Sequence, residues 1–92
     1  MAYIPIYTKK FRKSLKKFQK AGKFKNEELK IIIGRLINNK PLEPKHRDHE
    51  LNGEYYPCRE CHVQNDILLV YELDEINSLI TFANLGTHSE LF

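Results

Sequence analysis

The spacing of the apolar residues differs between the first and second halves of this chain. In the two predicted helical segments, between residues 8 and 37, they recur every three or four positions, as on one face of a helix, and from about residue 55 they form short runs separated by turn residues. Helices followed by a series of strands predict an α+β domain with two layers. Because 92 residues leave room for only one such domain, we expect residues 1–92 to form a single unit.

The first predicted helix has a narrow apolar face. Phe11, Leu15 and Phe18 form one stripe, which indicates that a single face of the helix packs on a core. Thr8 is suited to cap its N-terminus, and we expect the helix to end near Lys20.

The remaining elements follow from similar signals. A strand at 3–7 contains Pro5, which has no N–H to donate, so we place it at an edge of the sheet. Asn26 is the expected N-cap of a second helix, which ends at 38–41 and is followed by a loop to residue 53. Three strands are then predicted at about 55–63, 67–73 and 78–84. The expected order is β-α-α-β-β-β, with both helices on one face of an antiparallel sheet.

Charge is distributed very unevenly along the chain. Residues 1–47 contain 14 Lys or Arg and 3 Asp or Glu. Residues 48–92 contain 1 Lys or Arg and 9 Asp or Glu. The first helix places like charges four residues apart, which destabilises a helix, and no acidic residue precedes Glu27. We therefore expect a polyanionic partner, for which the phosphates of a nucleic acid are suitable, rather than a merely solvated face.

No segment predicts a membrane or an export signal. The longest apolar run, 67–71, is far shorter than the roughly 20 residues that span a bilayer. The N-terminus has neither a basic region nor a long apolar stretch before a cleavage site. We expect a cytoplasmic protein in a reducing environment, without a membrane partner.

The segment Cys58-Arg59-Glu60-Cys61-His62 has the spacing of a haem-attachment motif and of half a zinc site. Cysteines three apart on a regular strand face opposite ways, which is poor geometry for a disulfide or a zinc half-site. Covalent haem attachment generally takes place outside the cytoplasm, and no Met beyond Met1 could serve as an axial ligand. We therefore expect no cofactor and no metal. A metal-binding module that uses Cys58, Cys61, His49 and His46 stays open as an alternative, to be tested by metal analysis.

The strand predicted at about 55–63 also places a carboxylate and an imidazole on one face. Glu60 and His62 are two residues apart and project together, with Asp66 just beyond in a turn. His49 and His88 can reach the same end of the sheet. Metal-free RNA cleavage needs a base for the 2′-hydroxyl, an acid for the leaving oxygen and donors for the phosphate, and histidine can serve in each role.

Four segments of the chain together carry a resemblance to a known family. They are Asp48-His49-x-Leu51-x-Gly53, Arg59-Glu60-x-His62-Val63-x-x-Asp66, the strand at 67–71, and Gly86-Thr87-His88-x-x-Leu91-Phe92. The chain resembles the YafQ branch of the RelE toxin superfamily from end to end. Glu60 stands where the family commonly has Asp, and Ile67 replaces an aromatic residue found in some members.

The resemblance implies a type II toxin–antitoxin toxin that cleaves mRNA in the ribosomal A site and is inhibited by a cognate antitoxin. It implies a RelE-like fold, a monomeric toxin and a hetero-oligomer with the antitoxin. It also implies a catalytic cluster that contains His49, Glu60, His62, Asp66 and His88, with Phe92 in support or stacking near the mRNA.

Within that cluster we assign His49 or Glu60 as base and His88 as acid, while His62 and Asp66 orient the phosphate. The ribosomal RNA or mRNA backbone is expected to contact the cations Lys9, Lys10, Arg12, Lys13, Lys16, Lys17, Lys20, Arg35, Lys45, Arg47 and Arg59. The main alternative is a non-catalytic RNA- or DNA-binding module whose histidines are structural.

Overall fold

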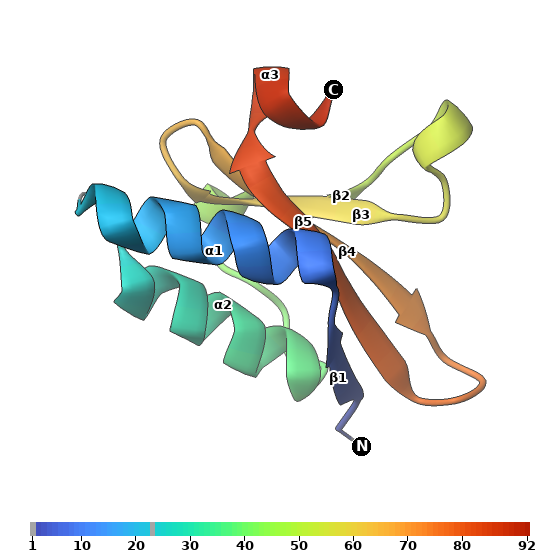
Figure 1. Cartoon of the computed structure of the whole chain (residues 1–92). Coiled ribbons are helices and arrows are strands. Elements are labelled where there is room, and N and C mark those ends of the chain that lie inside the picture. The colour runs from blue at the N-terminus through green and yellow to red at the C-terminus, as the bar shows by residue number, and fades with distance from the viewer. Residues whose placement is uncertain (1, 23) are drawn as a thin grey trace.

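The computed structural model describes residues 2–22 and 24–92 and has the expected α+β architecture (Figure 1). The elements are β1 (Ile4–Tyr7), α1 (Lys9–Ala21), α2 (Asn26–Ile37), the 3-10 turn η1 (Pro44–His46), β2 (His49–Glu50), the 3-10 turn η2 (Gly53–Tyr55), β3 (Arg59–Gln64), β4 (Ile67–Asp74), β5 (Leu79–Thr87) and α3 (His88–Leu91).

The five strands form one sheet in the order β1-β5-β4-β3-β2. β1 lies at an edge, as Pro5 predicts, and it pairs parallel to β5. The pairs β2–β3, β3–β4 and β4–β5 are antiparallel. The sheet is therefore antiparallel except at the edge where the chain enters it.

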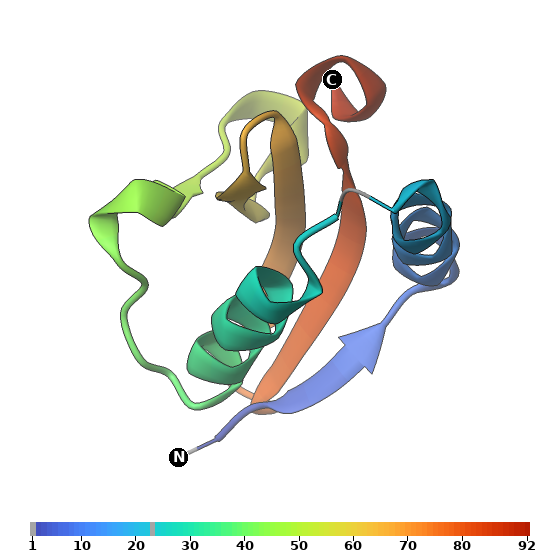
Figure 2. The ribbon, with the colours of Figure 1, turned by 90° about the vertical axis from the view of Figure 1, so that its left-hand side faces the viewer.

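The two long helices lie side by side, run in opposite directions and cover the same face of the sheet (Figures 1 and 2). The Thr8 hydroxyl accepts a hydrogen bond from the backbone N–H of Phe11 at 3.1 Å, so Thr8 caps α1 as predicted. Gly22 ends α1 with a φ of 80°, a left-handed conformation that glycine adopts without strain.

Both helices pack on one hydrophobic core. It joins Phe11 of α1 and Ile32 of α2 to Leu69, Ile80 and Phe82 of the sheet, each at most 2% exposed. Leu68 and Val70 are buried on the opposite face of the sheet, which the two long helices do not cover. Residues of α3 pack on this second face of the sheet beside Gly86, the register partner of Leu68.

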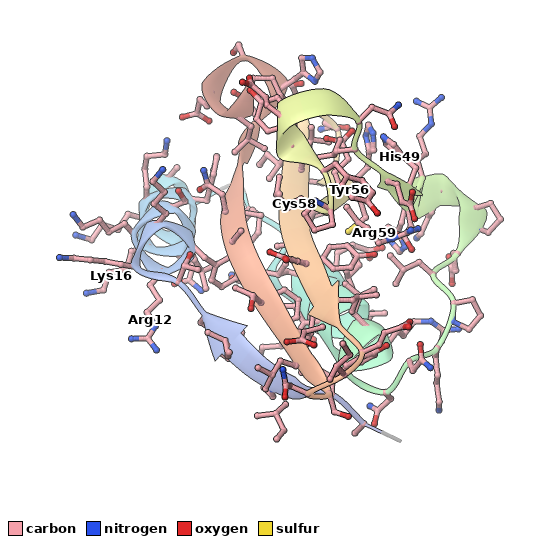
Figure 3. All side chains as sticks on the ribbon, turned by 90° about the vertical axis from the view of Figure 1, so that its right-hand side faces the viewer. Arg12, Lys16, His49, Tyr56, Cys58 and Arg59 are labelled. Atoms are coloured by element: carbon pink, nitrogen blue, oxygen red, sulfur yellow. The ribbon has the colours of Figure 1, made fainter. Side chains whose placement is uncertain are left out.

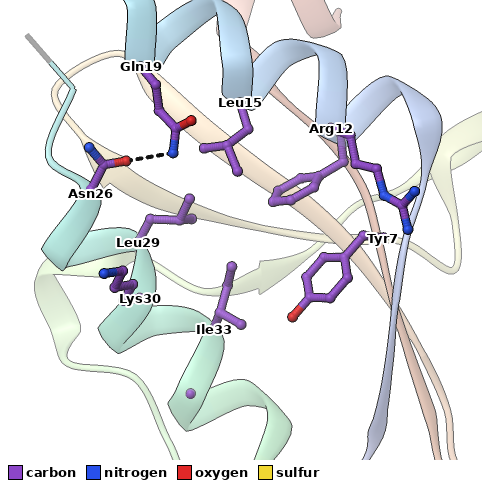
Figure 4. Close-up of a pocket in the computed structure, with 10 residues that line it drawn as sticks. Tyr7, Arg12, Leu15, Gln19, Asn26, Leu29, Lys30 and Ile33 are labelled. Atoms are coloured by element: carbon purple, nitrogen blue, oxygen red, sulfur yellow. Dashed lines mark hydrogen bonds between the residues drawn. The ribbon is translucent and has the colours of Figure 1, made fainter. Parts of the chain in front are cut away.

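Asn26 is not the N-cap of α2, contrary to the sequence prediction. The helix begins at Asn26, and its N-cap is Lys25, which makes no side-chain capping hydrogen bond. The Asn26 carboxamide oxygen instead accepts a hydrogen bond from Nε2 of Gln19 in α1, at 3.0 Å (Figure 4). The side chain that was expected to cap one helix thus links the two.

The predicted loop and the predicted strand after it also differ from the structure. The loop at 38–53 contains β2, a strand of two residues that alternation cannot reveal. The strand expected from residue 55 begins at Arg59, because residues 53–58 form η2 and a turn with a cis bond before Pro57. The last strand continues to Thr87 rather than to 84.

A groove of about 530 Å³ lies between α1 and α2 (Figure 4). Its lining is apolar along Phe11, Leu15, Leu29 and Ile33, and Arg12 stands at its rim. No helix within the described ranges is long and apolar enough to cross a membrane.

Candidate active site

His49 of β2 and Glu60 of β3 are register partners and their side chains meet. Nε2 of His49 lies 3.0 Å from Oε1 of Glu60, and Nδ1 lies 2.6 Å from the carbonyl oxygen of Arg47. Because a carbonyl oxygen only accepts, Nδ1 carries a hydrogen. The hydrogen bond to Glu60 then needs one more proton, held by either the imidazole or the carboxyl group. Without that proton the pair is a base, and with it the pair is an acid.

Glu60 is unusually buried for a carboxylate. The residue is 6% exposed, whereas the His49 side chain is 49% exposed. Oε2 of Glu60 is buried and has no hydrogen-bond partner among the described residues. A buried acceptor without a partner is costly, so the fold holds this oxygen in place at some expense of stability.

His62 continues the same face of β3 two residues further on. It is partly exposed and lies opposite Leu68 of β4, which in turn lies opposite Gly86 of β5. Adjacent strands are about 4.8 Å apart, so this row of three residues spans about 10 Å of the sheet. Asp66 is exposed in the turn between β3 and β4.

The tail folds back over this row. A Cβ added to Gly86 would lie 3.3 Å from Oε1 of Glu90 and 3.4 Å from Cδ2 of Leu91, so α3 passes close above the sheet at this glycine. The Thr87 hydroxyl accepts from the backbone N–H of Glu90 at 3.3 Å, and Oε1 of Glu90 accepts from the Thr87 N–H at 2.9 Å. This capping box fixes the direction of α3, which begins at His88.

The tail also contacts the loop after β2. The ring of Phe92 stands edge-on to that of Tyr55 at 4.8 Å between centroids, and the ring of His88 is 5.3 Å from Phe92. The structure thus joins His49 to Glu60 and His88 to Phe92, and it places His62 on the sheet face that the tail covers. Asp66 lies further out, in the turn.

The predicted nucleic-acid contacts on α1 are exposed along the helix. In Figure 3, Arg12 and Lys16 project away from the sheet on the side opposite to His49. Lys17 pairs with Glu90 of α3 at 2.5 Å. The basic face of α1 and the His49–Glu60 pair therefore lie on different sides of the molecule.

Of the predicted contact residues outside α1, Arg35 and Lys45 have protein partners. Nε of Arg35 donates to the carbonyl oxygen of Pro41 at 2.8 Å. Lys45 lies 3.2 Å from Glu28, which raises the pKa of Lys45. Arg47 is exposed, with a φ of 47°.

Arg59, the last of the predicted contact residues, belongs to a polar network with Asp48 and Tyr71. Nε of Arg59 lies 3.4 Å from Oδ1 of Asp48 and 3.3 Å from the Tyr71 hydroxyl, which itself donates to Asp48. Burial and the hydrogen bond to Asp48 raise the pKa of Tyr71 far above its usual range, so it stays a donor. The sequence did not predict a role for Tyr71, because nothing in an apolar strand indicates that the Tyr71 hydroxyl contacts Asp48, 23 positions earlier in a loop.

The residues of the alternative metal module are dispersed. Cys61 is buried in the core, where burial raises the pKa of its thiol, and Cys58 lies outside β3. His46 is buried, with Nε2 2.6 Å from Oε1 of Glu28, and Glu60 engages His49. Within residues 2–22 and 24–92 no group of three or more His, Cys, Asp or Glu could hold a metal ion.

Comparison with known proteins gives consistent results. The family model described as bacterial toxin of type II toxin–antitoxin system, YafQ, matches residues 3–92. The chain is 38% identical over 87 residues to the mRNA interferase toxin YafQ of Escherichia coli K12, covering 94% of this chain and 91% of that one.

Two solved structures are similar over nearly their whole length. A metal-bound toxin from Helicobacter pylori has a TM-score of 0.90 and 41% identity, with both chains fully covered. The E. coli DinJ-YafQ toxin–antitoxin complex has a TM-score of 0.88 and 34% identity, covering 100% of this chain and 99% of that one.

Proposed function

We propose that this chain, which belongs to the YafQ family of bacterial type II toxin–antitoxin toxins, cleaves mRNA in the ribosomal A site by acid–base catalysis without a metal. The toxin is an mRNA interferase, and therefore an endoribonuclease. The observation that carries the proposed chemistry is the contact of 3.0 Å between His49 and the buried Glu60.

In the proposed reaction the His49–Glu60 pair, in the form that lacks the shared proton, removes the proton from the 2′-hydroxyl of the nucleotide before the cut. The 2′-oxygen attacks the phosphorus and forms a 2′,3′-cyclic phosphate, while the bond from phosphorus to the 5′-oxygen breaks. His88 donates a proton to that leaving oxygen, and each proton transfer typically contributes about 10²- to 10⁴-fold in rate. The burial of Glu60 supports this role for the pair, because it excludes the water that would compete for the carboxylate.

His62 and Asp66 are proposed to orient the scissile phosphate. His62 is on the same face of β3 as Glu60, and the tail that carries His88 passes over its row. Phe92 is 40% exposed and already packs edge-on against Tyr55. Its exposed ring is suited to stack on a base of the mRNA.

The cations of α1 are proposed to bind ribosomal RNA rather than the scissile phosphate. They lie on the side of the molecule opposite to His49 (Figure 3). Binding of ribosomal RNA on one side and of mRNA on the other suits an enzyme that acts within a large ribonucleoprotein. This arrangement supports ribosome dependence, with the toxin acting in the cytoplasm.

Two further proposals concern bound groups and partners. A toxin from H. pylori has been solved with a bound metal. Among the described residues of this chain, no group of three or more His, Cys, Asp or Glu could hold a metal ion, and we assign its chemistry to side chains alone. A toxin similar to this one forms the E. coli DinJ-YafQ toxin–antitoxin complex, so we propose a monomeric toxin that joins a cognate antitoxin in a hetero-oligomer.

Purified toxin should be mixed with ribosomes programmed with a defined mRNA, with and without EDTA, and with the same mRNA free in solution. We expect cleavage in the A-site codon, a 2′,3′-cyclic phosphate end, and no effect of EDTA at constant magnesium activity. Equal cleavage of free mRNA would contradict ribosome dependence. Loss of cleavage on removal of trace transition metals, with recovery on their return, would contradict the metal-free mechanism.

A further inference from the structure

Strand β2 holds His49 but has little to keep it in place. It consists of two residues, His49 and Glu50, both exposed, at an edge of the sheet. The residue after the strand adds one backbone hydrogen bond, from the N–H of Leu51 to the carbonyl oxygen of Cys58, at 2.9 Å. Short edge strands with exposed side chains specify their register weakly.

Asp48, the residue before β2, makes the contacts with the rest of the sheet that the short strand itself lacks. The Asp48 carboxylate is about three-quarters buried and reaches past β3 to the hydroxyl of Tyr71 in β4, which is 1% exposed. Arg59 of β3 touches both of these groups, and its Nη1 lies 3.6 Å from Oε1 of Glu50. Asp48 thus links the start of β2 to two strands of the sheet.

The network and the catalytic pair are neighbours in sequence but lie on opposite faces. Asp48 precedes His49, and Arg59 precedes Glu60. Successive residues of a strand alternate between faces, so a slip of one position would turn His49 away from Glu60. Any interaction that fixes Asp48 against β3 and β4 therefore also fixes the contact between His49 and Glu60.

We infer that Asp48, Arg59 and Tyr71 are positioning residues, which hold β2 in the register that presents His49 to Glu60. The Tyr71 hydroxyl is the decisive group, because it comes from a central strand and is buried. This inference rests on the proposed function of the His49–Glu60 pair, but the placement of His49 can be measured without cleavage.

Tyr71→Phe removes the hydroxyl and keeps the ring in the core. Tyr7→Phe is the matched control, since Tyr7 packs on Phe11 and Phe82 in the same core and is remote from β2. Amide hydrogen exchange by NMR reports on the Leu51 N–H, and the ring signals of His49 report on its contact with Glu60. Asp48→Asn is the second variant, which keeps the shape of the side chain and removes the charge.

We expect Tyr71→Phe and Asp48→Asn to speed exchange at Leu51 about tenfold and to shift the His49 ring signals, with exchange in β4 and β5 unchanged. Single-turnover cleavage on programmed ribosomes should slow by about 10- to 100-fold at unchanged ribosome affinity, since small misplacements of a catalytic group have effects of this size. Tyr7→Phe should change none of these quantities.

Unchanged Leu51 exchange and unchanged His49 signals in both variants would overturn the inference. Equal acceleration of exchange in every strand would also overturn it, because that result describes general loss of stability. If His49→Ala still cleaves at the wild-type rate, the proposed function fails, whereas the NMR measurements continue to decide whether the network places His49.

Discussion

Nζ of Lys17 lies 2.5 Å from Oε2 of Glu90, so the first long helix is tied directly to the last turn of the chain. Glu90 also closes the capping box that sets the direction of α3. A residue of the basic helix and a residue of the tail therefore share one contact. Because α3 begins at His88, this ion pair connects the proposed ribosome-binding surface to the proposed general acid.

This contact predicts a specific dependence of stability on pH. The hydrogen bond from Lys17, followed by those from Thr87, lowers the pKa of Glu90 from 4.5 to about 2. A carboxyl group with a lowered pKa stabilises the fold fully above its unfolded pKa and loses that effect as the pH falls to its folded pKa. Glu90→Gln should thus reduce the free energy of unfolding at pH 7 by less than about 1 kcal/mol, since the pair is exposed.

Urea unfolding of wild type and Glu90→Gln between pH 7 and pH 2 measures this difference directly. We expect the difference to be constant above about pH 4.5 and to disappear as the pH approaches 2. Glu75→Gln, an exposed acidic residue in the turn after β4, is the control and should show no comparable trend. A Glu90 effect that stays the same across the whole range would refute the contact.

The two cysteines should differ in reactivity. Cys61 is fully buried in the core and Cys58 is partly exposed, and burial raises the pKa of both thiols. Ellman's reagent should label one thiol per native chain, slowly, and two in urea. Cys58→Ser should abolish native labelling and leave mRNA cleavage unchanged. Rapid labelling of both thiols, or protection of both by a metal, would contradict this prediction and would favour a metal site at Cys58 and Cys61.

Reversing charge on α1 should weaken ribosome binding more than catalysis. The double variant Lys13→Glu and Lys16→Glu should lower ribosome affinity at least about tenfold and flatten its dependence on salt, because fewer phosphates are neutralised. Cleavage at saturating toxin should keep its rate. Lys30→Glu on α2, beside Glu27 at 3.7 Å, is the control. If the double variant and wild type bind the ribosome with equal affinity, this face of α1 contacts solvent and not ribosomal RNA.

Local signals in the sequence predicted the elements that depend on local interactions. The stripe of apolar residues and Thr8 define α1, and short apolar runs between turns define β4 and β5 to within a few residues. The predicted face of Glu60 follows from alternation alone. The prediction of Asn26 as N-cap was wrong because Gln19 of another helix competes for its side chain.

Other features depend on contacts between distant segments. β2 is defined by its pairing with β3 rather than by its own two residues. Tyr71 lies beside an irregularity in the β4–β5 register, and its hydroxyl meets a loop that the sequence does not place. The resemblance pointed to His49 and His88 as candidate site residues, whereas the contacts through which Asp48, Arg59 and Thr87 position their segments could be found only from the structure.

The contact between His49 and Glu60 is the central claim, and a double-mutant cycle of single-turnover cleavage on programmed ribosomes tests it most directly. His49→Ala and Glu60→Gln should each slow cleavage by about 10²- to 10⁴-fold. The double variant should be no slower than the more damaging single variant, because the two groups act as one unit. Cleavage within about threefold of wild type in either single variant, or fully additive effects in the double variant, would contradict the account.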